Sequence, residues 1–351
     1  GGAVVFNQDG LVNVAGGTTF ALPSVSSGAG SGDYVIAGTG LVSFTNSTQT
    51  LNAGADISGA GLFSVNSGTL TVAGAMSVDN LTQSGGTITG SAALTVDNSF
   101  AWSGGTQGGA GSTTVVPGAA LTISGANPIL SARTFNQQST TGSWSGTGTI
   151  GLQAGAVFNN SGTLTATGDG LLRNDSGSVT FNNSGSFIKT TGAGTTTIDR
   201  SGGAAFTINN TGTGTMEVQS GTLQVGGAVV FNQDGLVNVA GGTVLTLTGL
   251  VGGFTNNATG VIQGTGTINL VGGTLTNDGA VWPGGAGTVG TLSITGNYSQ
   301  GAGGSLDVDL QSAASYDVLA VNGSATLGGT LNASYLGGYT AATGAAHPVL
   351  T

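Results

Sequence analysis

The sequence predicts an all-β chain folded as a right-handed parallel β-helix, a single-stranded solenoid with roughly 20–25 residues per coil. Three observations predict this fold. The composition favours strands and turns over helices, a Phe-Asn pair recurs along the chain, and polar and apolar residues alternate in short runs.

The composition supplies strand formers and turn formers but few helix formers. Glycine accounts for 70 of the 351 residues, only 5% of the residues are charged, and Glu217 is the single glutamate. Gly, Thr, Ser, Asn and Val favour strands and turns, whereas the surface residues of helices are nearly absent. With 38% hydrophobic residues, the chain can still bury a core and is not expected to be disordered.

A phenylalanine followed closely by asparagine recurs in steps of 23, 23, 25, 25 and 23 residues. In a solenoid, like residues of successive coils form columns, and asparagine amides at one corner can hydrogen-bond to those above and below. A β-sandwich or propeller array is the alternative, but this repeat is too short for a propeller blade. The residues expected to stack are Phe135, Phe158, Phe181, Phe206, Phe231, Phe254, Asn136, Asn159, Asn182 and Asn232.

Short segments alternate polar and apolar residues, which is the period of a strand with one buried face. Examples are residues 69–72, 93–96, 121–123 and 267–270, and glycine or asparagine lies close to the ends of such runs. One repeat of about 23 residues could hold three such strands with their turns.

The first 18 residues recur without change at 226–243, which indicates a long duplication. In the second copy the segment follows residues that already read as strand, so we expect residue 1 to lie inside a larger repeat array. Residues 1–281 are predicted to form the repeat region. The run Trp282-Pro283-Gly284-Gly285 interrupts the pattern, and residues 282–351 are expected to continue or begin to cap the solenoid.

The FNNSGTL-type repeats, the GTGTI turns and the closing segment from PGGAGTVGTLSITGNYSQ to HPVLT resemble the passenger regions of bacterial autotransporters and related haemagglutinin-like adhesins. The repeat style covers most of the chain, and the last 70 residues or so carry the more specific likeness. The resemblance implies a right-handed parallel β-helix that crosses the outer membrane and is displayed or released. It implies an outer-membrane translocator outside this chain, but it transfers no binding residues.

Charge excludes some partners. The formal net charge is −10, and four Lys and Arg residues cannot neutralise a nucleic-acid backbone or bind an anionic membrane. The chain has no cysteine, no apolar run long enough for a transmembrane helix, and no N-terminal basic-then-apolar signal.

Catalytic, cofactor and metal sites are not expected. His347 is the only histidine, so a Ser-His-Asp triad would need it, yet it precedes Pro348 without a nucleophile motif. Metal sites built on His or Cys clusters are excluded by counting. The run from Gly146 to Gly151 matches the dinucleotide pattern G-x-G-x-x-G, but no helix follows it. Trp102, Trp144 and Trp282 could stack on sugars if exposed, although core or corner packing is favoured.

A polysaccharide lyase or hydrolase is the enzymatic alternative. Asp307 and Asp309 are two apart on one predicted strand and share a face, with Asp317 nearby. Paired carboxylates could perform acid-base chemistry or bind Ca²⁺, but a solvated role is favoured. All four cations lie far from them in sequence, at Arg133, Arg173, Lys189 and Arg200. The Arg173/Asp175 and Asp199/Arg200 groups are expected to be surface ion pairs or isolated charges.

The leading functional hypothesis is therefore a non-enzymatic extracellular or cell-surface protein, an adhesin or rigid stalk. Its long uncharged face would bind glycans, a host or neighbouring cell surface, or other copies of itself. A self-assembling extracellular filament or matrix protein is a close alternative, favoured by the duplication, because end-to-end stacking would hide exposed coil edges.

Overall fold

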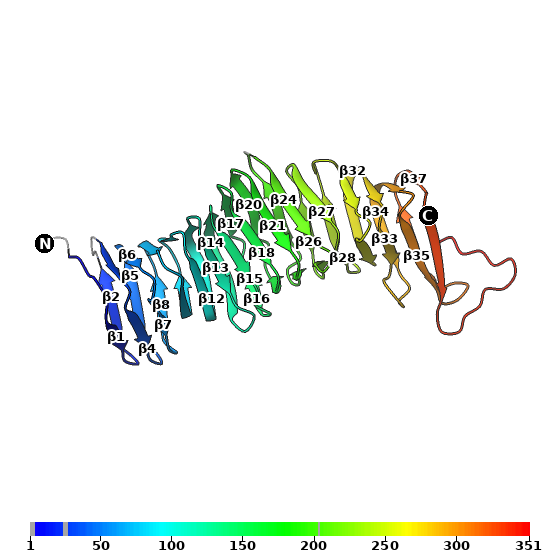
Figure 1. Cartoon of the computed structure of the whole chain (residues 1–351). Coiled ribbons are helices and arrows are strands. Elements are labelled where there is room, and N and C mark those ends of the chain that lie inside the picture. Colours follow the sequence, from blue (N-terminus) through cyan, green and yellow to red (C-terminus); the bar gives the residue numbers. More distant parts are fainter. Residues whose placement is uncertain (1–3, 24–26, 203) are drawn as a thin grey trace. The chain divides into compact units, whose positions relative to one another are not determined.

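The computed structural model describes residues 4–23, 27–202 and 204–351, and these residues are all-β, without a helix (Figure 1). The predicted fold class is confirmed: strands wind as a parallel β-solenoid. Residues 1–3 of the duplicated segment lie outside the described residues. In the described ranges, nothing has the helical length and apolar character needed to cross a membrane.

The chain divides into two compact units, the first being Gly1–Thr165, Gly170–Thr180 and Gly202–Ala204. The strands up to the end of this unit are β1 (Leu11–Val14), β2 (Thr19–Pro23), β3 (Gly28–Gly30), β4 (Asp33–Ile36), β5 (Leu41–Thr45), β6 (Ser47–Leu51), β7 (Ile57–Ser58), β8 (Leu62–Val65), β9 (Gly68–Val72), β10 (Met76–Gln83), β11 (Thr87–Thr89), β12 (Ala93–Gly108), β13 (Ser112–Val115), β14 (Ala120–Ser131), β15 (Thr134–Gln137), β16 (Gly142–Trp144), β17 (Thr149–Gln153), β18 (Val157–Asn160), β19 (Thr163–Ala166), β20 (Leu171–Ser176) and β21 (Val179–Asn183).

The second unit is Ala166–Asp169, Phe181–Ser201 and Ala205–Thr351. Its further strands are β22 (Ser186–Lys189), β23 (Thr195–Arg200), β24 (Phe206–Asn210), β25 (Thr215–Val218), β26 (Thr222–Val225), β27 (Val229–Gln233), β28 (Leu236–Val239), β29 (Val244–Leu247), β30 (Phe254–Asn256), β31 (Val261–Gly264), β32 (Thr267–Asn277), β33 (Ala280–Pro283), β34 (Thr291–Gln300), β35 (Ser305–Leu310), β36 (Val318–Val321), β37 (Ala325–Thr326) and β38 (Thr330–Tyr335).

Each strand pairs in parallel with its counterpart one coil later, and the register gives the length of each coil. In the first unit Thr69 pairs with Thr87, only 18 positions on, while Thr134 pairs with Val157, 23 positions on. In the second unit Ser186 pairs with Thr215, 29 positions on. The extra residues enter turns, so coil length varies while the strands stay in register.

The core consists of the inward side chains of every strand. Most four-residue strands show the burial pattern intermediate–buried–intermediate–buried, as in β19 and β28, which is the alternation read from the sequence. Glycine is needed where the backbones of adjacent coils meet. At Gly264 the backbone φ is +119°, and an added Cβ would lie 2.1 Å from the Val239 carbonyl oxygen, so no other residue fits that turn without strain.

Candidate functional site

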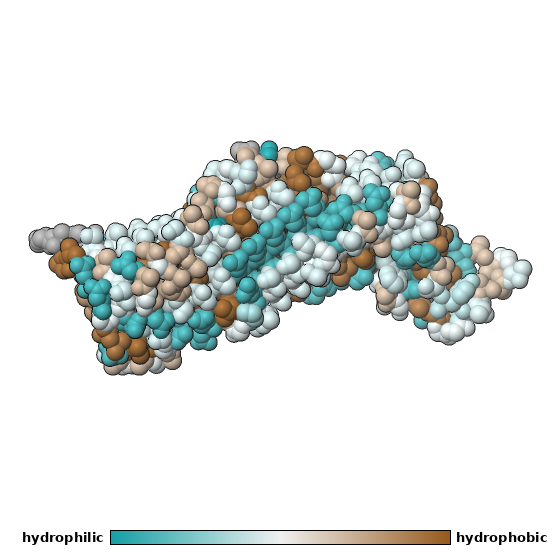
Figure 2. Space-filling model, viewed as in Figure 1, coloured by the Kyte–Doolittle hydropathy of each residue, from teal (hydrophilic) through white to brown (hydrophobic). Residues whose placement is uncertain are grey.

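The asparagines that follow the recurrent phenylalanines form an outward column. In the first unit Asn159 Nδ2 donates to Asn136 Oδ1 at 2.8 Å. In the second unit Asn209 donates to Asn182, and Asn232 donates to Asn209, both at 2.7 Å. These residues lie within strands rather than at a turn, and Asn209 joins the column although the sequence pattern did not select it. Figure 2 shows hydrophilic residues over β24 and β27, the strands that carry Asn209 and Asn232.

The phenylalanines stack only where the register is the same as their spacing. Phe135 pairs with Phe158, with ring centroids 5.1 Å apart, and the Phe231 and Phe254 rings lie 5.3 Å apart. Phe206, in contrast, lies opposite Val229, and Phe231 lies opposite Ile208. These two phenylalanines therefore do not share a column.

The physical reason is that Asn209 pairs with Asn232, 23 positions on, whereas Phe206 and Phe231 are 25 positions apart. The strand register therefore places the Asn209 side-chain amide opposite the Asn232 side-chain amide. The two phenylalanines are then offset along the strand by two residues, and both still point into the core. Phe181 also lies in the core, where its ring meets Phe187 edge-on at 5.7 Å.

A second amide column lies inside the core, and the Phe-Asn pattern of the sequence did not predict it. Asn183 Nδ2 donates to Asn210 Oδ1, and Asn210 Nδ2 donates to Gln233 Oε1, both at 2.8 Å, and all three residues are fully buried. Asn210 also donates to the Leu236 carbonyl one coil later at 3.0 Å. Asn210 therefore joins both a side chain and a backbone carbonyl of the neighbouring coil, which satisfies polar groups in the core.

The same kind of column continues toward the C-terminus. Asn256 donates to Asn277 at 2.8 Å, Asn277 donates to the Tyr298 hydroxyl at 3.1 Å, and that hydroxyl donates to Gln300 at 2.9 Å. Burial raises the pKa of Tyr298 to about 12, so the phenol stays protonated and can donate.

A mixed polar chain also lies in the core of the first unit. Gln107 donates to Gln83 Oε1, and the Thr113 hydroxyl donates to Gln107 Oε1, both at 2.7 Å. Arg133 Nε then donates to the Thr113 hydroxyl at 2.8 Å, and its Nη atoms donate to the carbonyls of Gly108 and Ser112 at 3.0 and 2.6 Å. Arg133 is 1% exposed, and burial lowers its pKa to about 10. Its hydrogen bonds to one side chain and two backbone carbonyls make it a cross-link inside the core.

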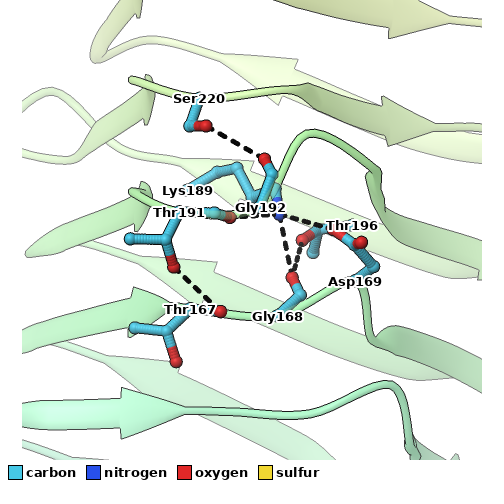
Figure 3. A network of polar contacts seen from close by, with 8 residues as sticks. All are labelled: Thr167, Gly168, Asp169, Lys189, Thr191, Gly192, Thr196 and Ser220. Carbon is cyan, nitrogen blue, oxygen red and sulfur yellow. Dashed lines mark hydrogen bonds and ion pairs between the residues drawn. The ribbon is translucent and has the colours of Figure 1, made fainter.

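Lys189 is a second buried cation, in the second unit (Figure 3). Its Nζ donates to the carbonyl of Gly168 at 2.9 Å, to Asp169 Oδ1 at 2.8 Å and to the carbonyl of Thr191 at 2.7 Å. Three donors meet three acceptors, so the ammonium is fully used in fastening turns. Thr196 also donates to the Gly168 carbonyl, at 2.7 Å.

Asp307 and Asp309 have different surroundings despite their spacing. Asp307 is half-buried and accepts from the Ser305 hydroxyl and from Asn332 Nδ2, both at 2.7 Å. Asp309 is 1% exposed and its Oδ2 accepts from the Gly287 amide at 2.7 Å. The solvated role predicted for this pair is therefore wrong for Asp309, because the loop that contains Gly287 covers that carboxylate.

Asp317 is fully buried beside Asp309. Its Oδ2 accepts from the Asp309 amide at 2.8 Å, and its Oδ1 accepts from the Gly290 amide at 2.7 Å. Burial raises the pKa of Asp317 to about 6, although the two backbone donors oppose the shift. The two carboxylates hold a glycine-rich loop, and neither is placed to meet a polymer at the surface.

The remaining ionic candidates are local. Arg173 forms an ion pair with Asp175 two residues away, and the Arg200 amide donates to Asp199 Oδ1 at 2.6 Å. Within the described ranges no three His, Cys, Asp or Glu side chains come together as metal ligands would.

The single histidine lies among tyrosines. His347 Nε2 is 3.0 Å from the Tyr339 hydroxyl, and its ring packs edge-on against Tyr316 at 5.2 Å. No serine or aspartate hydrogen bond to His347 occurs in the part of the chain that the structure describes, so a Ser-His-Asp arrangement is not formed.

The tryptophans differ in exposure. Trp102 is fully buried, with its ring 5.5 Å from that of Phe135 and inclined to it by 30°, and Trp144 is 3% exposed. Neither can stack on a sugar. Trp282 is half-buried at an outward position of β33.

No protein-family model, no curated protein and no solved structure matches this chain. What the fold and its columns define is a class: a parallel β-solenoid repeat protein.

Proposed function

We propose that this chain is part of a non-enzymatic extracellular or cell-surface β-solenoid that acts as an adhesin or rigid stalk, of the kind found in autotransporter passengers. The observation that carries the proposal is the uncharged outer surface of registered amides and hydroxyls, typified by the Asn182, Asn209 and Asn232 column. Such a surface presents the same weak hydrogen-bonding groups in successive coils.

Mechanical stiffness follows from the way the coils are joined. Strand ladders, the outward asparagine column and the inward amide column all run across the coils, so a pulling force is shared by many hydrogen bonds. Surface contacts that are individually weak add through effective concentration when many are engaged together. Glycans, cell surfaces or other copies of the chain are the proposed partners.

Self-association into a filament or matrix is the second candidate. Strand β38 favours it, because all six residues Thr330–Tyr335 are exposed, including Leu331 at 59% and Tyr335 at 54%. β38 pairs with β35, and its other edge pairs with no strand of the described residues. A strand edge with exposed apolar side chains is able to pair with a strand of another copy.

An enzymatic role is less well supported. A lyase or hydrolase needs carboxylates, and often a base or cation, facing the polymer. Asp309 and Asp317 are buried under a loop, while Arg133 and Lys189 are buried and bound to carbonyl oxygens. The observations favour a scaffold over a catalyst.

The proposal is tested by force measurement between beads coated with the chain and surfaces coated with dextran, with mannan or with the chain itself. We expect attachment that strengthens steeply with coating density, as multivalent contacts require. Attachment no stronger than that of beads coated with an acidic protein of similar charge would overturn the proposal. So would steady release of oligosaccharides from polygalacturonate or alginate that is lost in Asp309→Asn.

A further inference from the structure

Two columns of threonine lie on one outer face of the first unit, across strands β6, β9, β11 and β12. Strands β6, β9 and β11 each carry two outward threonines, two residues apart, and β12 adds one more. The strand register pairs them coil by coil. The first column is Thr48, Thr69, Thr87 and Thr106, and the second is Thr50, Thr71 and Thr89.

The fold sets the dimensions of this array. Neighbouring parallel strands lie about 4.8 Å apart, and residues i and i+2 of one strand lie about 6.6 Å apart. The side chains between the two columns, such as Leu70 and Ile88, are buried at 1% and 0% exposure and anchor the sheet from below. The hydroxyls therefore occupy a two-dimensional lattice with fixed repeats.

These hydroxyls differ from the asparagine column in having no protein partner. In the described residues, none of the seven threonine hydroxyls forms a hydrogen bond with another protein group, whereas Asn136 and Asn159 bond to each other. Threonine is β-branched, so its χ1 angle is restricted and the hydroxyl is held in place before any ligand arrives. The array is thus both ordered and available.

The surroundings of the array exclude most other ligands. The outward positions of β6, β9 and β11 hold no charged and no aromatic residue, and glycine at Gly68 and Gly105 keeps the margins low. Sugar rings are usually bound by aromatic faces together with amide or carboxylate groups. A face that presents only hydroxyl and methyl groups is suited to a ligand whose polar groups are all O–H donors and oxygen acceptors.

We propose that this threonine array binds ordered water and thereby the surface of ice. Its repeat of about 4.8 Å across the strands is close to an oxygen–oxygen repeat on the prism faces of ice, so waters held by the hydroxyls along each column lie near positions of lattice waters. Bridging waters are nearly as favourable as direct hydrogen bonds, and the rigid side chains lose little freedom on binding. The methyl groups fill the spaces between these waters. This activity goes beyond the adhesin or stalk role and does not depend on it.

The experiment uses the whole chain and measures ice recrystallisation inhibition, together with enrichment of the protein in slowly grown ice. The test variant is Thr71→Lys with Thr89→Lys, which places two charges in the second column. The matched control is Thr82→Lys, because Thr82 is a half-buried outward residue of β10 on another face. Circular dichroism and thermal unfolding establish that all three proteins fold alike.

We expect the wild-type chain and Thr82→Lys to be enriched in ice and to inhibit recrystallisation, and the double variant to lose about tenfold or more of its potency, because the contacts act together. A wild-type chain that is excluded from ice would overturn the inference. So would equal loss in Thr82→Lys and in the double variant. Retention on insoluble chitin or cellulose that depends on Thr71 and Thr89, without enrichment in ice, would assign the array to a glycan instead.

Discussion

Residues 4–14 and 229–239 have the same sequence, VVFNQDGLVNV, but different surroundings. In the second unit this segment forms β27 and β28, and β27 pairs with β24 on one side and β30 on the other. In the first unit only residues 11–14 form a strand, and Val5 contributes a single bridge to Ser27. Val229 is fully buried, whereas Val4 is 60% exposed.

The difference shows what makes a strand in this fold. Both copies have the same intrinsic propensities, so propensity alone does not decide the outcome. The second copy lies between two coils, which supply hydrogen bonds on both edges and bury the alternate side chains. No strand of the described residues pairs with the other edge of β1, which is bonded to β4 alone. Each coil is therefore stabilised chiefly by its neighbours.

The largest expected effect comes from one charge placed in each copy. Val229→Asp buries a carboxylate in the core and should lower the local stability of β27 and β28 by about 4 kcal/mol. Val4→Asp, in the same sequence context, should change it by less than about 0.5 kcal/mol. Hydrogen exchange of the strand amides measures both changes. Equal effects in the two copies would contradict the role given to the neighbouring coils.

The second largest difference is expected between substitutions in the inward amide column and substitutions in the outward asparagine column. Asn210→Ala leaves Asn183 and Gln233 without their buried partner and should cost about 2 kcal/mol. Asn209→Ala removes an outward amide that water can replace, so we expect about 0.5–1 kcal/mol. Denaturant unfolding of the two variants provides the comparison. A larger loss for Asn209→Ala would show that the outward column, not the inward one, holds the coils together.

The buried Asp317 predicts a pH dependence of known sign. Folding raises its pKa from 3.8 to about 6, so the folded chain binds more protons than the unfolded chain between these values. Stability from this group is therefore present below about pH 4 and is lost as the pH rises through 6. Relative to Asp317→Asn, the wild-type chain should lose about 2 kcal/mol between pH 4 and pH 7.5.

The control for this measurement is Asp307→Asn, on the same strand as Asp309 but half-buried. It shows what the loss of a carboxylate from this part of the chain does by itself, so that the effect specific to position 317 can be separated from it. If Asp317→Asn keeps the wild-type profile, then Asp317 is not the group that titrates near pH 6.

The smallest effect compares the two copies again, at the asparagine after the phenylalanine. Asn232 donates to Asn209 at 2.7 Å, while Asn7 accepts from the Ala29 amide at 3.1 Å in an exposed setting. Asn232→Ala should lower the free energy of unfolding by about 1 kcal/mol, and Asn7→Ala should lower it by about 0.3 kcal/mol. Hydrogen exchange at β27 and at residues 27–30 resolves the two, and the reverse order would count against a column that matters to stability.

Much of the fold could be read from the sequence because its two periods are physical. The alternation of polar and apolar residues predicted which side chains face inward and which face outward. The recurring Phe-Asn pair predicted the length of a coil. The inward amides could have been found by the same rule, since Gln137 lies two residues after the inward Phe135 and must face the same way. The register at Phe206 could not, because the asparagine that meets Asn232 is Asn209, three residues after Phe206 rather than next to it.

The polar groups in the core were the least predictable part. Arginine and lysine are seldom buried, and several acceptors of Arg133 and Lys189 are backbone carbonyls about 20 to 25 residues earlier in the chain. Only the stacking of coils brings such atoms together. The closure of a loop over Asp309 likewise depends on a contact with Gly287 that no local pattern encodes.

The most direct test of the account is the register of the coils themselves. The chain has no cysteine, so pairs can be introduced without background. Asn136 and Asn159 are register partners, and parallel neighbours lie close enough for a disulfide. Asn136→Cys with Asn159→Cys should oxidise to an intramolecular disulfide, seen by mass spectrometry. Asn136→Cys with Val157→Cys, offset by two residues on the same face, should not. Efficient bridging of the offset pair and not of the register pair would contradict the stacked solenoid.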